Sequence, residues 1–242
     1  MSQKYSHICL VMAMQGEAQP LIDKLQFEHL GDVYPNLPPQ LYQTAYEELT
    51  LSLVLLGQDK RFSVDWVGTE PATLATQLAI DKLSPDLVIS TGTAGGFASK
   101  GSDIGSIVAS HGDFLFHDHD IPLPDFKESG EGRYPSLGVT AMATLLGFQS
   151  GRVSSGSSLR KTDYEVAMID QSNAYAKDME STAVAGICML HNIPCFALRS
   201  ITNLVDLYNE SESEFIKNFD TAVESLTDAL ERVIEYINQD NL

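Results

Sequence analysis

Acidic side chains stand beside apolar runs of strand length, at places where a carboxylate can take part in a reaction. Glu17 follows the apolar run Ile8–Met14, and Asp178 and Glu180 open a helical pattern. A carboxylate after a buried strand can activate a water or accept hydrogen bonds from a sugar. The plainer alternatives are a solvated Glu17 in the first turn of a helix near Gln15, and Asp178 as a helix cap.

A cluster of small residues, 91–96, ends another apolar run. Its glycines would let backbone amides approach a ligand closely, although a tight turn alone would use the same residues. The spacing fits neither the dinucleotide motif G-x-G-x-x-G nor a P-loop, so neither site is supported. A carboxylate 4 Å from a phosphate charge costs about 4 kcal/mol at an effective dielectric of 20. Glu17 is therefore expected to exclude phosphate; holding and deprotonating a water is the chemistry open to it, with the solvated acid as the alternative.

The elements that position these residues alternate along the chain. Apolar runs and helical patterns follow one another, which is typical of an α/β domain with a substantially parallel sheet. Strands are expected at residues 7–13, 49–56, 86–91, 106–110, 150–155 and 194–202. Helices are expected at residues 72–83, 181–190 and 214–237, the last covering the sheet with one apolar stripe. Residues 35–39 and 113–134 are expected to be irregular loops.

Composition narrows the class of protein. The chain has 242 residues, 33 acidic and 15 basic, and a net charge of -18, which argues against nucleic-acid or anionic membrane partners. No linker composition interrupts it, so we expect one domain over residues 1–242. The run Ile8–Met14 is too short for a membrane span and lacks the flanks of a secretory signal, so a cytoplasmic location is expected. Cys9, Cys188 and Cys195 fit buried hydrophobes in a reducing compartment, with a catalytic thiol as the alternative.

Two other classes of site are weakly supported. The segment His117–Asp120 alternates His and Asp, which in an extended chain leaves two ligands per face where a metal site needs three or four. Hydrogen bonding in a loop or at a subunit contact is expected there instead, and no metal. No G-x-S-x-G motif surrounds a serine, which argues against a serine hydrolase.

Six stretches, taken in order, closely resemble the purine nucleosidases that hydrolyse 5′-methylthioadenosine and S-adenosylhomocysteine, within the nucleoside phosphorylase superfamily. They are residues 13–18, 67–72, 91–97, 116–118, 178–180 and 199–206. The V-G-T-x-P-A and L-V-D stretches are more similar to the plant-type branch than to the common bacterial type. The resemblance covers nearly the whole chain. It implies a single-domain, three-layer nucleoside phosphorylase-like α/β fold with a central mixed sheet flanked by helices, no cofactor, a small purine nucleoside as substrate, and a homodimer.

The resemblance also implies roles at matching positions. Glu17 would orient and activate the attacking water, with Thr93 and Arg199 helping to hold it. Glu180 would accept hydrogen bonds from the ribose 2′- and 3′-hydroxyls. The substrate-binding positions that it implies, beside the catalytic ones, are Met14, Val67, Ala94, Gly95, Leu159, Arg160, Met179, Glu180 and Ile121.

These binding residues fall into groups. Leu159 would lie against the purine face, and the backbone near Arg160 would hydrogen-bond the base edge. Met14 and Val67 would border the 5′-alkylthio pocket. Family members usually complete that pocket with residues of a second subunit, and Ile121 with its Pro-Leu-Pro neighbours is the expected closing piece here.

The chain departs from the family pattern at Asn203, where the family has an aspartate that acts as general acid. Four interpretations stay open: an engineered substrate-trapping variant, a natural enzyme for 6-oxopurine or futalosine-type nucleosides, a nucleoside-binding protein without catalysis, and an adenine nucleosidase with another proton donor. Asp206 is the nearest candidate for that donor. Ser157, where many relatives carry aspartate, puts the support of the Leu159 loop in question.

Overall fold

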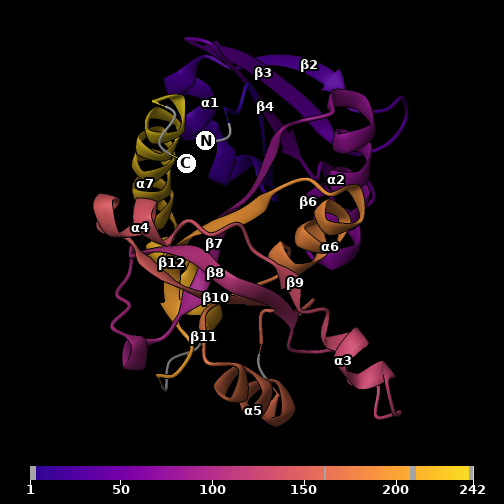
Figure 1. Ribbon diagram of the computed structural model, residues 1–242, viewed down its shortest axis with the longest axis vertical. Helices are drawn as coiled ribbons and strands as arrows, with labels where there is room; N and C mark the ends of the chain where they lie inside the picture. Colours follow the sequence, from indigo (N-terminus) through magenta and orange to yellow (C-terminus); the bar gives the residue numbers. More distant parts are fainter. Residues whose placement is uncertain (1–3, 161, 208–210, 240–241) are drawn as a thin grey trace.

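The structure is a computed structural model that describes residues 4–160, 162–207, 211–239 and 242. A large mixed sheet lies between two groups of helices (Figure 1). One face is covered by α1 (Gln15–Leu25), α4 (Thr140–Leu146) and α7 (Ser211–Asn238). The other is covered by α2 (Thr69–Leu83) and α6 (Ser181–His191). The expected three-layer α/β architecture is confirmed.

The strands of the sheet follow the order β11-β10-β8-β12-β7-β1-β4-β3-β2, with β9 paired to β8. Their bounds are β1 His7–Met12, β2 Glu28–Asp32, β3 Gln40–Tyr46, β4 Leu49–Leu55, β7 Leu87–Gly96, β8 Ile107–Phe116, β9 Tyr134–Pro135, β10 Gln149–Ser155, β11 Ala174–Asp178 and β12 Cys195–Leu204. A separate small hairpin joins β5 (Gln58–Asp59) and β6 (Val64–Asp65). The pairs of β1 with β4 and β7, and of β7 with β12, are parallel, whereas β12 and β8 are antiparallel.

One end of the sheet closes on itself. Strand β11 pairs with β10 and also, in antiparallel fashion, with the end of β7, so that β7, β12, β8, β10 and β11 form a closed set. Gly95 of β7 is paired with Lys177 of β11 on one side and with Asn203 of β12 on the other. Side chains that lie far apart in the sequence therefore surround a single glycine.

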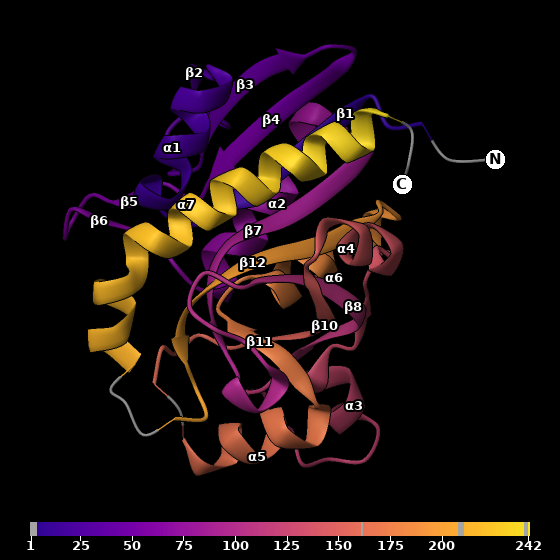
Figure 2. The ribbon, with the colours of Figure 1, turned by 90° about the vertical axis from the view of Figure 1, so that its left-hand side faces the viewer.

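The core consists of two main layers of apolar side chains, one on each face of the sheet. Helix α7 crosses the first face obliquely (Figure 2) and buries the stripe that the helical period predicts. Its fully buried members are Ala222, Leu226, Leu230, Val233 and Ile237. Burying each large aliphatic side chain contributes about 1.5–3 kcal/mol, which fixes a long helix of otherwise polar sequence against the sheet. The three cysteines are buried and free, in line with the apolar interpretation.

Three strands run further than expected, and the glycine cluster is not a tight turn. Strand β7 continues to Gly96 as a fully paired strand beside β12. A Cβ atom at Gly95 would stand 2.5 Å from Val205 Cγ2, and one at Gly96 would stand 2.8 Å from Ile201 Cγ2. Glycine is needed here because side chains that follow or belong to β12 occupy the space a side chain would take.

Other elements were not expected from the sequence. These are β2, β3, the hairpin β5–β6, β9, β11 and the helices α3 (Phe126–Glu131), α4 and α5 (Asp163–Ser172). The irregular interpretation of residues 113–134 is wrong at both ends, because residues 113–116 complete β8 and Tyr134 begins β9, and α3 interrupts it. Residues 35–39 hold no helix or strand, as expected.

Candidate active site

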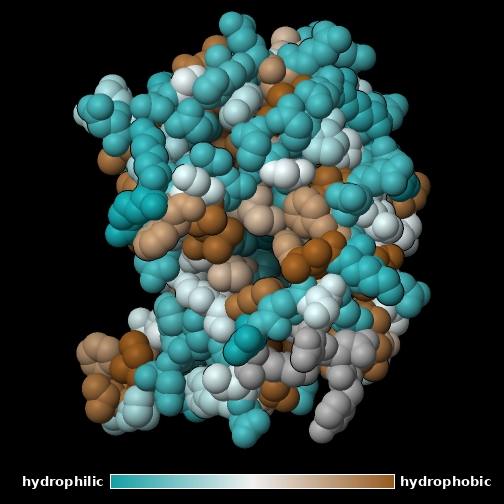
Figure 3. Space-filling view, turned by 180° about the vertical axis from the view of Figure 1, so that it is seen from behind, coloured by the Kyte–Doolittle hydropathy of each residue, from teal (hydrophilic) through white to brown (hydrophobic). Residues whose placement is uncertain are grey.

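A pocket of about 270 Å³ opens near the carboxyl ends of β1, β7, β11 and β12. The face of the molecule opposite to that in Figure 1 is hollowed, and apolar side chains border the hollow (Figure 3). The walls of the pocket are Ala13, Met14, Glu17, Val67, Thr93, Ala94, Gly95, Leu159, Lys177, Asp178, Met179, Glu180, Thr202, Asn203 and Phe215. Ten of the expected site residues are therefore brought together. We call Glu17, Asp178 and Glu180 the carboxylate end, and Leu159, Lys177 and Asn203 the amide end.

Glu17 is held in the pocket wall by two groups of one residue. Its Oε1 accepts a hydrogen bond from the Thr93 amide (2.7 Å) and another from the Thr93 hydroxyl (2.6 Å). Its Oε2 faces the Met14 amide at 3.3 Å. The residue is 3% exposed, so the solvated alternative is wrong. Burial raises the pKa of Glu17, while the Thr93 hydrogen bonds and the charge of Arg199 oppose the rise.

Arg199 lies behind the pocket rather than in its wall. Its Nε stands 2.7 Å from Asp178 Oδ2, and its Nη2 donates to the hydroxyls of Ser90 and Ser181, each at 2.9 Å. A Cβ atom at Gly92 would meet Arg199 Nη1 at 2.6 Å, so the strand and the guanidinium pack directly against each other. The expected role of Arg199 beside the water stays a prediction, whereas its ion pair with Asp178 is a structural fact.

Asp178 and Glu180 share the start of α6. Glu180 is the N-cap residue of α6, and Asp178 Oδ1, two residues earlier, accepts hydrogen bonds from the Glu180 amide (3.2 Å) and from the first helical amide, that of Ser181 (3.3 Å). Glu180 Oε1 accepts from the Gly68 amide at 3.0 Å. Gly68 has φ +106°, a conformation that favours glycine and that turns this amide toward the carboxylate. Burial, with the Asp178 charge adding, raises the pKa of Glu180 to about 7, although Arg199 lowers it.

At the amide end, Asn203 is buried on β12. The Thr202 hydroxyl lies 3.0 Å from Asn203 Oδ1 and 3.2 Å from the carbonyl oxygen of Ala94. A Cβ atom at Gly95 would stand 3.2 Å from Asn203 Nδ2, so the amide lies directly over this glycine. The side chain is therefore positioned by its own strand and by β7, not by a loop.

The loop that carries Leu159 is held from two sides. Lys177 Nζ donates to the carbonyl oxygens of Ser158 (2.7 Å), Leu159 (3.2 Å) and Arg160 (3.0 Å). On the other side, the Ser157 amide donates to Asp118 Oδ2 at 2.7 Å. Ser157 Oγ also lies 2.8 Å from Thr69 Oγ1, so serine at this position still anchors the loop.

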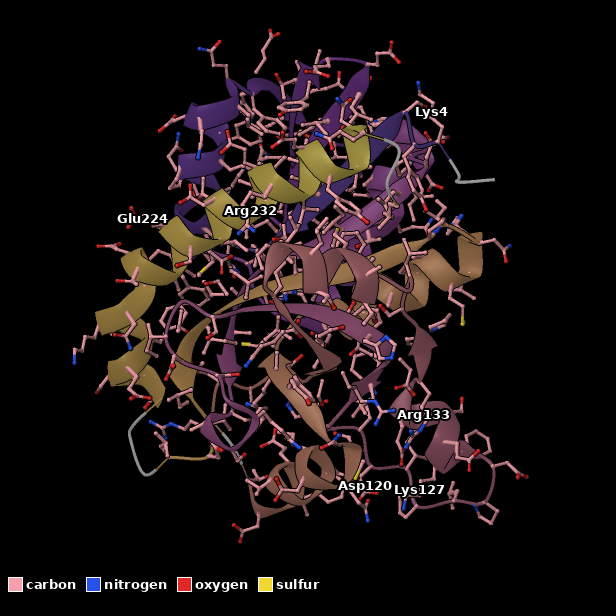
Figure 4. All side chains as sticks on the ribbon, turned by 60° about the vertical axis from the view of Figure 1, so that its left-hand side comes forward. Lys4, Asp120, Lys127, Arg133, Glu224 and Arg232 are labelled. Carbon is pink, nitrogen blue, oxygen red and sulfur yellow. The ribbon has the colours of Figure 1, made fainter. Side chains whose placement is uncertain are left out.

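Two expected binding residues do not line the pocket of their own chain. Ile121 lies on the segment before α3, 39% exposed. The neighbourhood of α3, labelled by Lys127 in Figure 4, lies at the opposite end of the molecule from α7, labelled by Glu224. Arg160 Nε is bound to Glu212 Oε1 at 2.7 Å. Neither residue lines the pocket, and the roles of both stay predictions.

Asp206 is not placed as a proton donor. Its two carboxylate oxygens accept hydrogen bonds from the amides of Ala98 and Ser99, each at 2.8 Å, at the start of a short 3-10 turn. Burial acts to raise its pKa, but these hydrogen bonds outweigh burial and lower it, so the group stays ionised at neutral pH. A carboxylate in this state has no proton to give.

Five lining residues were not among the expected site residues: Ala13, Lys177, Asp178, Thr202 and Phe215. Phe215 was recognised only as a member of the apolar stripe of α7. Asp178 carried a signal, since it lies two residues before Glu180 at a helix start. Lys177 carried none, because a lysine in the sequence is expected to be exposed, and its partners are carbonyl groups of a distant loop.

The histidine segment is structural. His117 is fully buried and its Nδ1 lies 2.8 Å from Ser154 Oγ, beneath the Leu159 loop. Burial, followed by the charge of Lys177, lowers the pKa of His117 to about 4. Over residues 4–160, 162–207, 211–239 and 242, no three His, Cys, Asp or Glu side chains gather as metal ligands would. None of the helices in that part of the chain has the length and apolar character of a membrane span.

A model of the phosphorylase superfamily matches residues 7–235 of the chain. A 5′-methylthioadenosine nucleosidase of Arabidopsis thaliana is 36% identical over 239 residues, covering 98% of this chain and 89% of the relative. The chain belongs to the methylthioadenosine nucleosidase family of this superfamily. A second Arabidopsis relative in the family, a 5′-methylthioadenosine/S-adenosylhomocysteine nucleosidase, is 32% identical over 96% of this chain and 92% of its own.

Solved structures of the nucleosidase family agree in fold. The apo structure of Arabidopsis thaliana 5′-methylthioadenosine nucleosidase superimposes with a TM-score of 0.95 at 34% identity, covering 99% of this chain and 100% of that chain. The expected nucleoside phosphorylase-like fold, the plant-like branch and the enzyme class are confirmed at the level of the family.

Proposed function

We propose that this protein hydrolyses the N-glycosidic bond of 5′-methylthioadenosine, releasing adenine and the 5′-thioribose, with S-adenosylhomocysteine as a further substrate. The observation that carries the proposal is the buried Glu17 carboxylate, which is fixed by Thr93 in the wall of the same pocket as Glu180 and Asn203. No cofactor enters the reaction. The family supplies the substrate class, because its Arabidopsis members are named for this nucleoside.

The reaction uses the two ends of the pocket differently. Glu17 takes a proton from a water that attacks C1′ of the ribose, and the C1′–N9 bond breaks with its electron pair going to the purine. Glu180 accepts hydrogen bonds from the ribose hydroxyls beside the Met179 side chain. Positive charge grows on the sugar in the transition state, and the carboxylate end stabilises it electrostatically.

Water rather than phosphate is the nucleophile. Arg199, a guanidinium that would suit a phosphate, is neutralised by Asp178 and bound by Ser90 and Ser181. Glu17 places a further negative charge where phosphate would have to bind, and like charges at this range repel. Added phosphate is therefore expected to leave base release unchanged.

Asn203 replaces the proton donor with an amide, so the proposed activity is slow. Its Nδ2 donates to N7 of the purine and its Oδ1 accepts from the 6-amino group, the bidentate pairing that suits adenine. A 6-oxopurine nucleoside is the second candidate. The Thr202 hydroxyl beside Asn203 Oδ1 favours it, because the amide then offers its N–H groups to N7 and O6.

The 5′ substituent is expected between Met14, Val67 and Phe215, in a part of the pocket that a second subunit completes. Ile121, Leu123 and Phe126 are exposed apolar side chains around α3, and they support a homodimer in which this segment covers the partner's pocket. Sedimentation of the wild type and of Phe126→Asp tests this. A wild-type monomer would contradict the dimer. The cytoplasmic location stays a prediction.

The test compares the wild type with Asn203→Asp on 5′-methylthioadenosine and on 5′-methylthioinosine, with free base followed by chromatography. General acid catalysis contributes about 10² to 10⁴ in rate, so Asn203→Asp is expected to release adenine about 10²-fold faster. Faster cleavage of the inosine analogue by the wild type favours the 6-oxopurine candidate. Tight binding without release of either base by both proteins contradicts the enzymatic proposal, and a sugar 1-phosphate in the presence of phosphate contradicts hydrolysis.

A further inference from the structure

The amide end contains a buried positive charge beside the asparagine. Lys177 is 7% exposed and lines the pocket, although it lies on a strand that the sequence did not predict. Its Nζ is within hydrogen-bonding distance of three consecutive carbonyl oxygens, those of residues 158–160. An ammonium group has three N–H donors, so this cradle matches its charged form. The charge also reaches the neighbouring His117, whose pKa it helps to lower.

The sheet fixes where this charge lies relative to Asn203. Gly95 pairs with Lys177 on β11 and with Asn203 on β12, so two strand spacings of about 4.8 Å separate the two backbones. A small cavity of about 30 Å³ adjoins the main pocket, and its walls include Lys177, Asn203, Leu159 and also Asp178, whose carboxylate is paired with Arg199. A cavity of this size has room for one water. Lys177 and Asn203 therefore face the same small volume.

The charges of the pocket are divided between its two ends. Glu17 and Glu180 are at the carboxylate end, while Asp178, which borders both ends, is neutralised by Arg199 through the 2.7 Å ion pair. Lys177 is at the amide end. Cleavage of an N-glycosidic bond leaves positive charge on the sugar and negative charge on the purine, so this division follows the charges of the transition state.

From this arrangement we infer that Lys177 compensates for the missing acid: its ammonium stabilises the purine as it leaves as an anion, and holds the Leu159 loop against the base. The inference rests on the proposed hydrolysis. The C1′–N9 bond breaks, its electrons remain on the purine, Glu17 takes the proton of the attacking water, and solvent water later protonates the free base. Lys177 gives up no proton in this sequence. It is a positioning residue whose charge acts through space.

The experiment uses two substrates with bases of nearly the same shape, 5′-methylthioadenosine and its 2-fluoro analogue. Fluorine withdraws electrons, so 2-fluoroadenine leaves more readily as an anion and needs less stabilisation. Lys177→Gln keeps a hydrogen-bond donor and removes the charge, Lys177→Met removes both, and Lys177→Arg keeps the charge. Removing one preorganised electrostatic group typically costs about 10² to 10³ in kcat. We expect Lys177→Gln and Lys177→Met to lose about 10²-fold in kcat on the first substrate and about tenfold on the second, and Lys177→Arg to retain most activity.

Asp118→Asn is the matched control, because Asp118 holds the same loop from the other side through the Ser157 amide. A loosened loop lowers turnover of both substrates by the same factor. Thermal unfolding checks each variant, and if Lys177→Met is unfolded, the comparison of Lys177→Gln with Lys177→Arg replaces it. Equal losses on the two substrates for Lys177→Gln, or no rescue in Lys177→Arg, overturn the inference.

A double-mutant cycle supplies an independent readout. In the Asn203→Asp background an acid protonates the base, so the leaving group carries less negative charge. Lys177→Gln is then expected to cost less than about tenfold, against about 10²-fold in the wild type. An equal cost in both backgrounds contradicts compensation. If neither the wild type nor Asn203→Asp releases base from either substrate, the proposed function has failed and this inference falls with it.

Discussion

The carboxylate end and the amide end of the pocket are built on different principles. Glu17 and Glu180 follow strands, are buried, and each has an oxygen fixed by a backbone amide from another element. Leu159, by contrast, lies on a loop, is 40% exposed, and is held by a hydrogen bond from Lys177 Nζ to its backbone carbonyl oxygen. The reacting water and the sugar would thus meet a preorganised surface, while the base would meet both the fixed side chain of Asn203 and the exposed side chain of Leu159. Such a division lets chemistry be conserved while specificity varies.

The change at the carboxylate end that is expected to lower activity most is Glu17→Gln, which removes the base that accepts the proton of water. Turnover of 5′-methylthioadenosine is expected to fall about 10³-fold, within the range for a lost general base. The amide has nearly the same shape, so substrate affinity, measured by isothermal titration, is expected to stay within about threefold. A variant that retains a tenth or more of the wild-type kcat contradicts the role of Glu17.

The two ends also differ in how far the sequence predicts them. Glu17 was noticed because a carboxylate shortly after an apolar run is visible in the sequence, but its role came from the resemblance to the nucleosidases. The stripe of α7 was predicted because its period is regular. The burial of Glu17 was left open, since it depends on Thr93, 76 residues away. The helix start near Asp178 was visible too, because capping contacts are local. These features depend on neighbours in the chain or on periodicity.

The amide end was harder to predict because its determinants are not local. Lys177 is buried but its hydrogen-bond partners lie on a separate loop, and the pairing of β11 with β7 that places it beside Asn203 joins segments far apart in the sequence. The glycine cluster was misread for the same reason. Glycine is required at Gly95 and Gly96 because the side chains of Val205 and Ile201 leave no room for a Cβ atom, not because the chain turns there. Contacts of this kind appear only when the sheet is assembled.

The activity is expected to depend on pH through the two glutamates of the carboxylate end. Burial raises the pKa of Glu17. Burial, with the Asp178 charge adding, raises the pKa of Glu180 to about 7. Both carboxylates act in their ionised forms, so activity is present above these pKa values and lost as the pH falls through them. With a pKa of about 7, kcat/KM is expected to fall about tenfold between about pH 8 and about pH 6. A flat profile down to about pH 5 would show that neither group controls the rate.

The raised pKa of Glu180 affects stability and activity in opposite directions: low pH lowers the activity but stabilises the folded protein. The ordinary pKa of a glutamate, about 4.5, applies to Glu180 in the unfolded chain, whereas the folded protein holds the Glu180 proton up to a higher pH. The raised pKa therefore adds to the free energy of unfolding, and this contribution is fully present below pH 4.5. It is lost as the pH rises toward about 7. Denaturant unfolding at several pH values checks this, with Glu180→Gln as the control that lacks the titrating group. An identical pH dependence in both proteins contradicts the raised pKa.

The smallest expected effect on activity is that of a substitution at Leu159, in the amide end. Leu159→Ala removes an apolar side chain that is partly exposed without substrate and would be covered by the purine, which costs about 1 kcal/mol of binding. KM for 5′-methylthioadenosine is expected to rise about fivefold with kcat nearly unchanged, since the contact is present in both the bound and the transition state. Leu190→Ala is the control, because Leu190 is 70% exposed at the end of α6, outside the pocket. A large fall in kcat would instead mean that Leu159 acts in the chemical step, as the carboxylate end does, and that its loop takes part through the carbonyl groups bound to Lys177.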